Sequence, residues 1–282
     1  MDGKGVCRSL WIAGLLVSAT FARADVIANG RQSYLRYCVG CHGEKGDGKG
    51  PAAIFLDPKP RDFTTGKFKF ASVASGELPH NEDLARTILH GLKGSSMPAW
   101  PLVPEQERNA IVEYIKTFSP RWTKSSPGVV IAIPDDPFRG DPTGIRKAIN
   151  RGELLYHTTT TCWQCHPGYV SSQRFEELYG EVKKRFPGVR ENFDKPVMKP
   201  DGWNNPLMPT DFKTDRIKTG IEMNNLFRVI ATGIGGTAMP SWKDSIPDED
   251  IWALAYYIRS LADERNETLR HDPLAPPTGA SR

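Results

Sequence analysis

The pattern of apolar and polar positions along the chain predicts helices. In 81–91, leucine and isoleucine recur at helical spacing behind Asn81 as a cap, and a longer apolar stripe covers 110–118. A third stripe covers 251–261, and acidic residues precede both longer stripes, where they favour the first turn of a helix. No segment combines strand alternation with hairpin turns. The sequence therefore predicts an all-α fold.

The same order of motifs occurs twice in the chain. The segment 83–100 recurs 142 residues later as 225–242. A fixed period of this kind indicates duplicated structural units, and we expect two tandem domains, at 25–120 and 146–263. Other matched motifs are Gly30 to Tyr34 with Gly152 to Tyr156, and Pro60-x-Asp62-Phe63 with Pro209-x-Asp211-Phe212.

The sequence predicts two non-helical stretches outside these domains. A segment at 121–145, rich in Pro, Gly and Asp, is expected to be a linker, and its apolar run 129–133 is expected to be extended between Pro127 and Pro134. The C-terminal stretch 264–282 holds three prolines and is expected to be a tail, disordered or draped on the surface.

The N-terminus has the order of a secretory signal peptide. Two basic residues precede an apolar stretch at 10–21, and Ala22-Arg23-Ala24 offers a small-x-small cleavage site. We expect 1–24 to be removed, so that the mature chain starts near Asp25 and works in the periplasm or another exported compartment. An uncleaved membrane anchor is the alternative, although the stretch is short for one.

The composition argues against a membrane-spanning mature chain and gives no support for nucleic-acid binding. The 282 residues are 39% hydrophobic and 25% charged, and the formal net charge is +4. No apolar run reaches the ~18 residues that a spanning helix needs, so no membrane span is expected in the mature chain. A net charge this small gives no argument for nucleic-acid binding.

Four of the five cysteines lie in two motifs of one kind, Cys38-Val-Gly-Cys41-His42 and Cys162-Trp-Gln-Cys165-His166. Residues three apart on a helical turn share one face, with Cβ atoms about 5–6 Å apart, so two such thiols can add to two vinyl groups of one porphyrin. The histidine that follows is then placed to bind the iron. Each motif therefore predicts one covalently attached haem c.

Three other uses of these cysteines explain less of the pattern. A shared zinc site would join cysteine pairs about 120 residues apart, far outside the usual zinc spacing, and would leave both histidines idle. A thioredoxin-like redox pair needs a βαβ context that neither segment offers. Structural disulfides, which export permits, would not account for a histidine at the same place twice.

With these motifs, each half of the chain resembles a class I cytochrome c domain, over about 25–118 and 148–262, and the whole resembles a bacterial diheme cytochrome c. The resemblance rests on the haem motifs, the Gly-x-x-x-Tyr helices and two Met-Pro loops. It implies a small helical fold wrapped around each of two covalently attached haems, with first and last helices crossing at their Gly and aromatic positions. It also implies that a methionine of the late loop binds iron opposite the histidine.

The methionines that fit this role are Met97 and Met239. Each lies in a glycine-containing loop before a proline, and the two coincide in the repeat, which ordinary core filling does not require. With His42 and His166 they would give two His/Met irons, suited to electron exchange. Met198, Met208 and Met223 compete with Met239 by position, and His80, His90, His157 and His271 are expected to be ordinary surface or helix histidines.

The halves also differ. Pro167 follows His166 where Gly43 follows His42, and the chain from histidine to methionine is 18 residues longer in the second half. The additional chain lies around 169–205 and carries basic side chains that form either a docking patch for an acidic partner or, as is commoner, a solvated charged face. These are Lys183, Lys184, Arg185, Arg190, Lys195 and Lys199. Trp100, Trp242, Tyr34, Tyr114, Tyr156 and Tyr257 are expected to be core groups near the rings.

The sequence thus predicts an exported diheme cytochrome c that carries single electrons between redox proteins such as a respiratory dehydrogenase, oxidase or reductase. One rival is a diheme enzyme of peroxidase or thiosulfate-dehydrogenase type with one open haem, against which the matched Met-Pro loops argue. The other is an electron-transfer subunit of a larger oxidoreductase complex, which shares the same ligand set.

Overall fold

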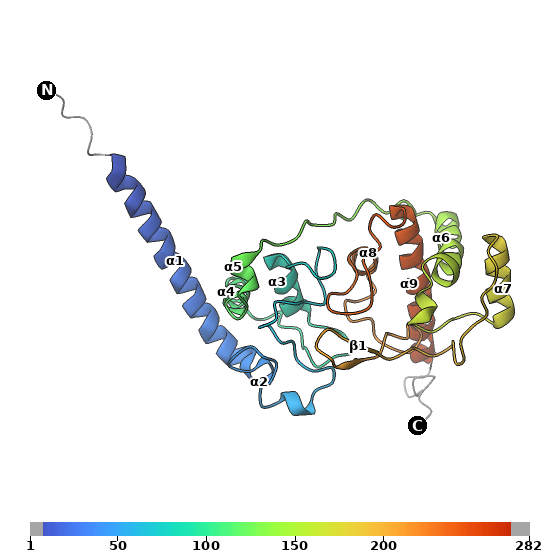
Figure 1. The fold of residues 1–282 in the computed structure, drawn as a ribbon, viewed down its shortest axis with the longest axis horizontal. Coiled ribbons are helices and arrows are strands. Elements are labelled where there is room, and N and C mark those ends of the chain that lie inside the picture. The colour runs from blue at the N-terminus through green and yellow to red at the C-terminus, as the bar shows by residue number, and fades with distance from the viewer. Residues whose placement is uncertain (1–7, 272–282) are drawn as a thin grey trace. The chain divides into compact units, whose positions relative to one another are not determined.

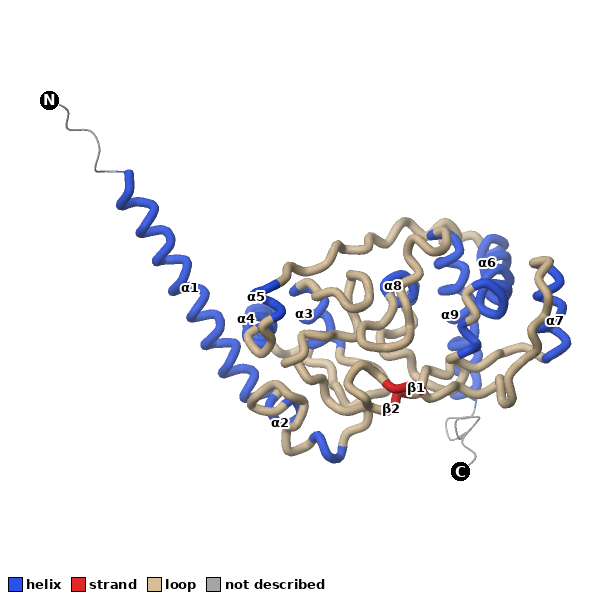
Figure 2. The backbone as a smooth tube through the Cα atoms, in the orientation of Figure 1, coloured by secondary structure: helices blue, strands red, loops and turns tan. Residues whose placement is uncertain are grey.

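The computed structural model describes residues 8–271, so parts of the predicted signal peptide and tail lie outside the described residues. Within this range the regular structure is helical apart from one short strand pair (Figures 1 and 2), and the all-α prediction is confirmed. The α-helices are α1 (Arg8–Tyr37), α2 (Val39–His42), α3 (Asn81–His90), α4 (Glu105–Lys116), α5 (Arg121–Lys124), α6 (Pro142–Leu154), α7 (Ser172–Glu181), α8 (Met223–Thr232) and α9 (Asp248–His271). Short 3-10 turns η1 (Ala53–Phe55) and η3 (Cys162–Gln164), a π-helical turn η2 (Leu155–Thr159), and strands β1 (Lys199–Pro200) and β2 (Pro206–Leu207) complete the order.

The chain forms two compact units. The first contains the residues up to Lys67 together with Asn81–Gly91 and Pro98–Ser126. The second contains Phe68–His80, Leu92–Met97 and the chain from Pro127 onward. Two segments from the N-terminal half, one of which carries Met97, therefore fold with the second unit.

In each unit the helix before the Cys-x-x-Cys-His motif packs at a glycine against a later long helix, α1 against α4 and α6 against α9. A Cβ atom on Gly30 of α1 would lie 2.0 Å from the carbonyl oxygen of Ala110 in α4. A Cβ atom on Gly152 of α6 would lie 2.2 Å from the carbonyl oxygen of Ala253 in α9. Only glycine permits this approach, and the crossing that the resemblance implies is present in both units.

The joint between α6 and the second Cys-x-x-Cys-His motif absorbs two extra residues. Tyr34 precedes Cys38 by four positions, whereas Tyr156 precedes Cys162 by six. The longer stretch continues α6 as the π-helical turn η2 and ends at Thr161, which has a left-handed φ of 46°. A π-helical turn takes up additional residues without ending the helix.

Several predicted boundaries differ from the structure. Asn81 is the first residue of α3 and not a cap before it. The predicted linker contains α5 and the first turn of α6, whose cap Asp141 accepts a hydrogen bond from the amide of Thr143 (2.9 Å). The start of the predicted tail is wrong, because α9 continues without a break to His271, whose side chain lies outside the described part of the chain.

The strand pair was not predicted. β1 and β2 are antiparallel, with Lys199 opposite Leu207 and Pro200 opposite Pro206. The turn between them is closed by the amide of Asp201, which donates to the carbonyl of Asn205 (2.9 Å). Two residues a strand are too few to show an alternation in sequence.

The helix α1 runs through the predicted cleavage site at 22–24 as one continuous helix. Among the residues that the structure describes, no helix combines the length and the apolar character that a membrane crossing needs. Cleavage after Ala24 stays a prediction.

Candidate functional site

The first Cys-x-x-Cys-His motif forms the single helical turn α2 directly after α1. The amide of His42 donates to the carbonyl of Cys38 (2.9 Å), and the amide of Gly43 donates to the carbonyl of Val39 (2.9 Å). Gly43 then leaves the turn at a φ of 78°, a conformation that favours glycine. Cys38 and Cys41 are therefore three residues apart on one turn, as the sequence predicts.

The second motif has a tighter turn. Pro167 has no amide hydrogen, so the bond that Gly43 makes in the first motif is lost, and 162–164 folds as the 3-10 turn η3. The amides of Cys165 and His166 both donate to the carbonyl of Cys162, at 3.1 and 2.9 Å. The substitution of proline for glycine thus changes the type of turn and keeps the cysteine spacing.

Both histidine rings are fixed by the same kind of bond. Nδ1 of His42 lies 3.0 Å from the carbonyl oxygen of Arg61, and Nδ1 of His166 lies 2.8 Å from that of Thr210. A carbonyl oxygen only accepts, so each Nδ1 carries the hydrogen and each Nε2 keeps a lone pair. Metal-binding histidines are usually oriented by such a second bond. Burial lowers the pKa of both rings, which favours the neutral form that binds a metal ion.

A phenylalanine supports each ring. Phe63 stacks on His42 with the ring centroids 4.5 Å apart, and Phe212 stacks on His166 at 4.8 Å. Both come from the repeated Pro-x-Asp-Phe motif, whose second residue supplies the carbonyl that holds Nδ1. The repeat is visible in the sequence, but residue types alone do not say which backbone carbonyl meets a ring.

A buried tyrosine fastens the chain after each histidine. The hydroxyl of Tyr34 donates to the carbonyl of Gly43 (2.7 Å), and that of Tyr156 donates to the carbonyl of Pro167 (2.8 Å). Burial raises the pKa of both hydroxyls, so they remain protonated donors. Of the other aromatic residues predicted to be core, Tyr257 is buried, and Tyr114, Trp100 and Trp242 are half-buried.

The two methionine loops share one internal hydrogen-bond pattern. The carbonyl of Met97 accepts from the amide five residues earlier (3.0 Å), and its amide donates to Oγ of Ser95 (3.3 Å). The loop of Met239 repeats both bonds, at 3.2 Å and, with Oγ1 of Thr237, at 3.1 Å. A glycine with φ of 66° or 68° makes the turn in each loop. The chain therefore builds one loop conformation twice, each time around a half-buried methionine.

The methionines and histidines that compete by position differ from Met97 and Met239 in exposure or in bonding. Met198 and Met208 are exposed, and Met223 packs against the hydrophobic core of the second unit. His90 is exposed, and Nε2 of His80 lies 2.8 Å from a backbone carbonyl oxygen.

One histidine departs from the prediction that it is an ordinary surface or helix residue. His157 in the π-helical turn is fully buried. Its Nδ1 donates to the carbonyl of Glu153 (2.8 Å), and its Nε2 accepts from the amide of Tyr169 (3.4 Å). Both ring nitrogens are thus used inside the protein, and the sequence contains no signal for this role.

The four cysteines of the motifs are free thiols. Within the described residues no three His, Cys, Asp or Glu side chains group to hold a metal ion. Burial raises the pKa of Cys38 to about 12 and that of Cys162 to about 11, so both thiols are protonated at neutral pH.

These residues fit haem c. Each half of the chain supplies two free thiols at the attachment spacing and a neutral histidine with one ring nitrogen fixed and the other available. Each half also supplies a methionine, whose thioether is a soft donor, in a loop of defined conformation.

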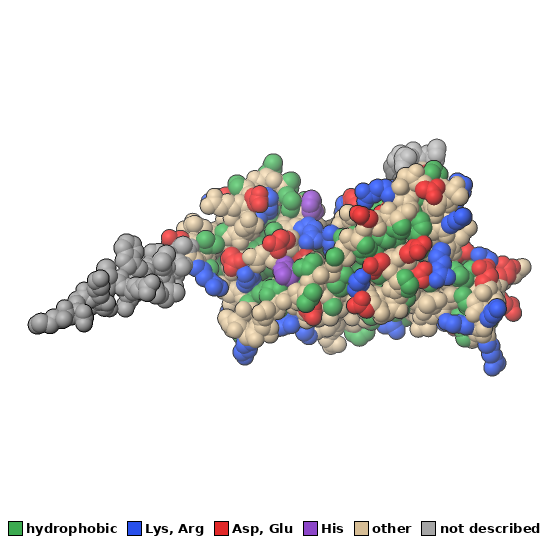
Figure 3. Space-filling model, turned by 90° about the horizontal axis from the view of Figure 1, so that it is seen from above, with side chains coloured by type: hydrophobic (Ala, Val, Ile, Leu, Met, Phe, Trp, Pro, Cys, Tyr) green, Lys and Arg blue, Asp and Glu red, His purple; other side chains and the backbone are tan. Residues whose placement is uncertain are grey.

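One member of the basic cluster predicted as a docking patch or a solvated face, Arg190, is half-buried and bonded to backbone carbonyls. The guanidinium of Arg190 donates to the carbonyls of Trp163 (3.2 Å) and His166 (3.4 Å) and to that of Asn192 (2.6 Å). Arg190 thus ties the additional chain of the second half to the second Cys-x-x-Cys-His motif. Lys183, Lys184, Arg185 and Lys195 are exposed, and Lys199 is half-buried. Figure 3 shows basic and acidic side chains interspersed on the face drawn, a distribution typical of a solvated surface.

Comparisons with known proteins bear on the whole arrangement. The family model described as cytochrome c oxidase, cbb3-type, subunit III matches residues 25–115 and 147–258. A chain of the reducing HAO-like protein complex of Kuenenia stuttgartiensis is 31% identical with a TM-score of 0.67, over 83% of this chain and 95% of that chain. No curated protein matches the sequence. The two matched regions coincide with the two repeats.

Proposed function

The chain belongs to the cytochrome c oxidase, cbb3-type, subunit III family as two tandem cytochrome c domains, and on this premise we propose that it is an exported diheme c-type cytochrome that passes single electrons between redox proteins. The observation that carries the proposal is the duplication of the Nδ1 bond of each histidine and of the internal hydrogen bonds of each methionine loop. Covalently bound haem c supplies an iron that gains and loses one electron at a time.

The proposal assigns haem attachment to the cysteines and iron binding to the histidines and methionines. Cys38 and Cys41 anchor the first haem and Cys162 and Cys165 anchor the second, so that neither cofactor is lost to the medium. His42 with Met97 would hold the iron of the first haem, and His166 with Met239 would hold that of the second. Thioether ligation favours the ferrous iron and raises the reduction potential.

Occupied sixth positions decide between a carrier and an enzyme. With both a histidine and a methionine bound, the iron would have no open position for oxygen, peroxide or carbon monoxide, and electron transfer would be its main reaction. Two such irons in one chain let electrons pass between the domains and let the protein accept from a two-electron donor in successive steps.

An optical spectrum of the purified protein, followed by carbon monoxide on the reduced form, tests this proposal. We expect a near-infrared methionine–iron band at two-haem strength and no response to carbon monoxide. A rapid response of half the haem would mean one open iron and would favour the enzyme. Replacement of both Cys162 and Cys165 by serine should halve the haem count measured by the pyridine haemochrome, and an unchanged count would contradict two attachment sites.

The second candidate is an electron-transfer subunit of a larger complex. It is favoured by the similar solved structure from Kuenenia stuttgartiensis, which is that of a protein complex. Purification at native expression levels separates the two functions, because a free carrier elutes at its own mass and a subunit elutes with its complex.

Export is tested separately. Cell fractionation should place the haem-containing protein in the periplasm, and mass spectrometry of the intact protein should find an N-terminus near Asp25. A retained 1–24 segment in a membrane fraction would favour the anchor.

A further inference from the structure

The 199–205 hairpin lies directly against the Met239 loop. The amide of Gly202 donates to the carbonyl of Gly236 (2.7 Å). The indole ring of Trp203 is so close that a Cβ atom on Gly236 would lie 2.5 Å from it. The hairpin belongs to the additional chain of the second half, so this contact has no equivalent in the first repeat.

A second segment holds the same loop. The amide of Gly235 donates to the carbonyl of Lys69 (2.9 Å). The ammonium of Lys69 forms an ion pair with Oδ2 of Asp201 (3.3 Å), with side chains only 13% and 5% exposed, and it lies 5.9 Å from the ring centroid of Trp203. The two segments that hold the loop are therefore bonded to each other, and all of these residues belong to the second compact unit.

Asp201 is the centre of this arrangement. Its Oδ1 accepts from the amides of Trp203 (3.0 Å) and Asn205 (2.9 Å), which shapes the hairpin turn, while Oδ2 receives Lys69. Burial alone would raise the pKa of the carboxyl group. The two amides and the ammonium outweigh burial, and the pKa lies below its usual range. A buried carboxylate satisfied on both oxygens holds its neighbours firmly.

The Met97 loop is held less tightly. The amide of Lys93 donates to the carbonyl of Lys218 (2.9 Å), but the ion pair of its ammonium with Glu222 has side chains 52% and 60% exposed. A Cβ atom on Gly94 would lie 3.1 Å from Cβ of Arg216, a milder contact than that of Gly236. The two loops thus share their internal bonds and differ in what holds them from outside.

We propose that Asp201 is a positioning residue for Met239, because it joins the hairpin to the Lys69 segment and so keeps the loop in the conformation that presents the thioether to iron. The proposal rests on the proposed function, in which Met239 is the sixth ligand of the second haem. It assigns to the additional chain of the second half a role in ligation.

The test compares Asp201→Ala with Met239→Ala in the full-length protein carrying both haems. Met239→Ala should remove half of the near-infrared methionine–iron band and open half of the haem to carbon monoxide. Asp201→Ala should move both readouts the same way, with two haems still counted by the pyridine haemochrome. Asp201→Asn keeps an acceptor for the hairpin amides. Its near-infrared band and its fraction of carbon monoxide-binding haem should lie between those of wild type and Asp201→Ala. Glu222→Gln, which removes the exposed ion pair beside the other loop, should change neither readout.

The outcomes separate the two proposals. An unchanged band in Met239→Ala would remove Met239 as a ligand, and the proposed His/Met site would fail. A halved band in Met239→Ala with a full band and no carbon monoxide binding in Asp201→Ala would overturn the positioning role alone. If Asp201→Ala yields no haem-loaded protein, the same two readouts are measured on Lys69→Met. This variant removes the ion pair with Asp201 but leaves the bonds of Asp201 to the hairpin amides in place. A full band in Lys69→Met would then overturn the role.

Discussion

Gly152 shows at the residue scale how one absent methyl group sets the packing of the second unit. Its Cβ position would lie 2.2 Å from the carbonyl oxygen of Ala253. Gly152→Ala therefore forces α6 and α9 apart, and we expect a loss of about 1–3 kcal/mol in the free energy of unfolding. Urea unfolding followed by far-UV circular dichroism measures it.

Gly180 provides the matched control. It also lies in a helix, α7, but a Cβ atom there would meet nothing within 4 Å. Gly180→Ala should raise the free energy of unfolding by about 0.5–1 kcal/mol, because alanine has the higher helix propensity. Equal effects of the two substitutions would show that helix propensity, and not the close approach, governs Gly152.

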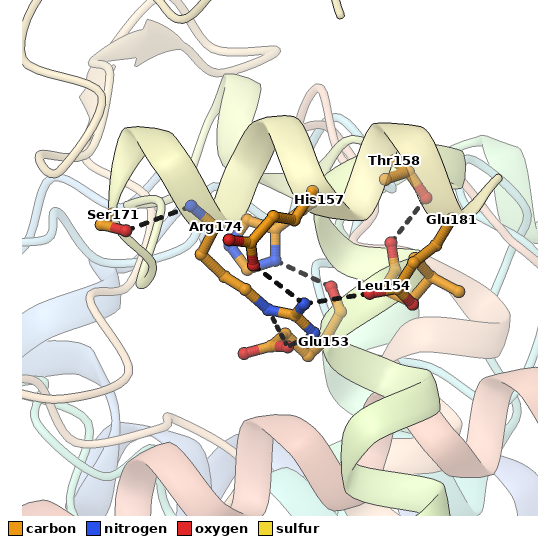
Figure 4. Close-up of polar contacts among 8 residues, drawn as sticks. Glu153, Leu154, His157, Thr158, Ser171, Arg174 and Glu181 are labelled. Carbon is orange, nitrogen blue, oxygen red and sulfur yellow. Dashed lines mark hydrogen bonds and ion pairs between the residues drawn. The ribbon is translucent and has the colours of Figure 1, made fainter. Parts of the chain in front are cut away.

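His157 adds a pH dependence to the same unit. Burial lowers its pKa to about 4, against the smaller opposing effect of the Nδ1 bond to the carbonyl of Glu153, and the guanidinium of Arg174 lowers it further. Figure 4 shows Arg174 from α7 beside His157, where it bonds to the carboxylates of Glu153 (2.9 Å) and Glu181 (2.9 Å). From α9, the ring of Tyr257 packs on the imidazole. The folded protein therefore resists a charge on this fully buried ring.

The sign of the effect follows from the two pKa values. The unfolded chain binds the proton near pH 6.5 and the folded protein only near pH 4, so the contribution to stability is complete above about pH 6.5 and is lost as the pH falls toward 4. The full loss is about 3 kcal/mol. Urea unfolding of wild type and His157→Gln at neutral and acidic pH isolates it, and parallel losses in the two proteins would assign the pH dependence to other groups.

At the scale of elements, Arg190 joins the additional chain of the second half to η3. Arg190→Ala would leave the carbonyls of Trp163 and His166 without this donor, and we expect a loss of about 2–3 kcal/mol in the free energy of unfolding. Arg190→Lys should recover only part of the loss, because an ammonium lacks the planar fork that reaches several carbonyls. Arg185→Ala, at an exposed position of the same segment, should change it by less than about 0.5 kcal/mol. A similar loss in both alanine variants would mean that positive charge, and not the bonds of Arg190 to these carbonyls, sets the contribution to the free energy of unfolding.

How far the sequence predicts these elements depends on the range of the interactions. The stripes at 110–118 and 251–261 fall in α4 and α9, since helical periodicity is local. The carbonyl partners of His42 and His166 are 19 and 44 positions away, and nothing local encodes such a pairing. The bonds of Arg190 to the carbonyls of Trp163 and His166 are not predicted for the same reason, since these residues are 27 and 24 positions away. The predicted tail begins too early because the prolines that suggest it lie after His271 and do not interrupt the helical residues before them.

At the scale of the whole molecule, the two halves share the contacts that hold the proposed iron-binding histidines and methionine loops, and they differ in the chain that surrounds these groups. Each histidine has its carbonyl and its phenylalanine, and each methionine loop has the same internal bonds. The second half adds the hairpin against its methionine loop and the guanidinium against its haem motif. A shell that excludes water and holds cations near the iron disfavours the ferric state.

If each half holds one haem on the proposed His/Met ligands, the unequal surroundings of the two sites should make the haems titrate separately. We expect a spectroelectrochemical titration to resolve two one-electron steps, with the higher potential belonging to the second haem. The reason is that the additional chain around 169–205 contacts the Met239 loop and places the guanidinium of Arg190 beside the second haem motif. Met239→Ala should abolish the higher step and leave the lower one in place, while Met97→Ala should do the reverse. A single step that fits both haems of the wild type would mean that the additional chain does not tune the iron. Loss of the lower step in Met239→Ala would reverse the order of the two sites.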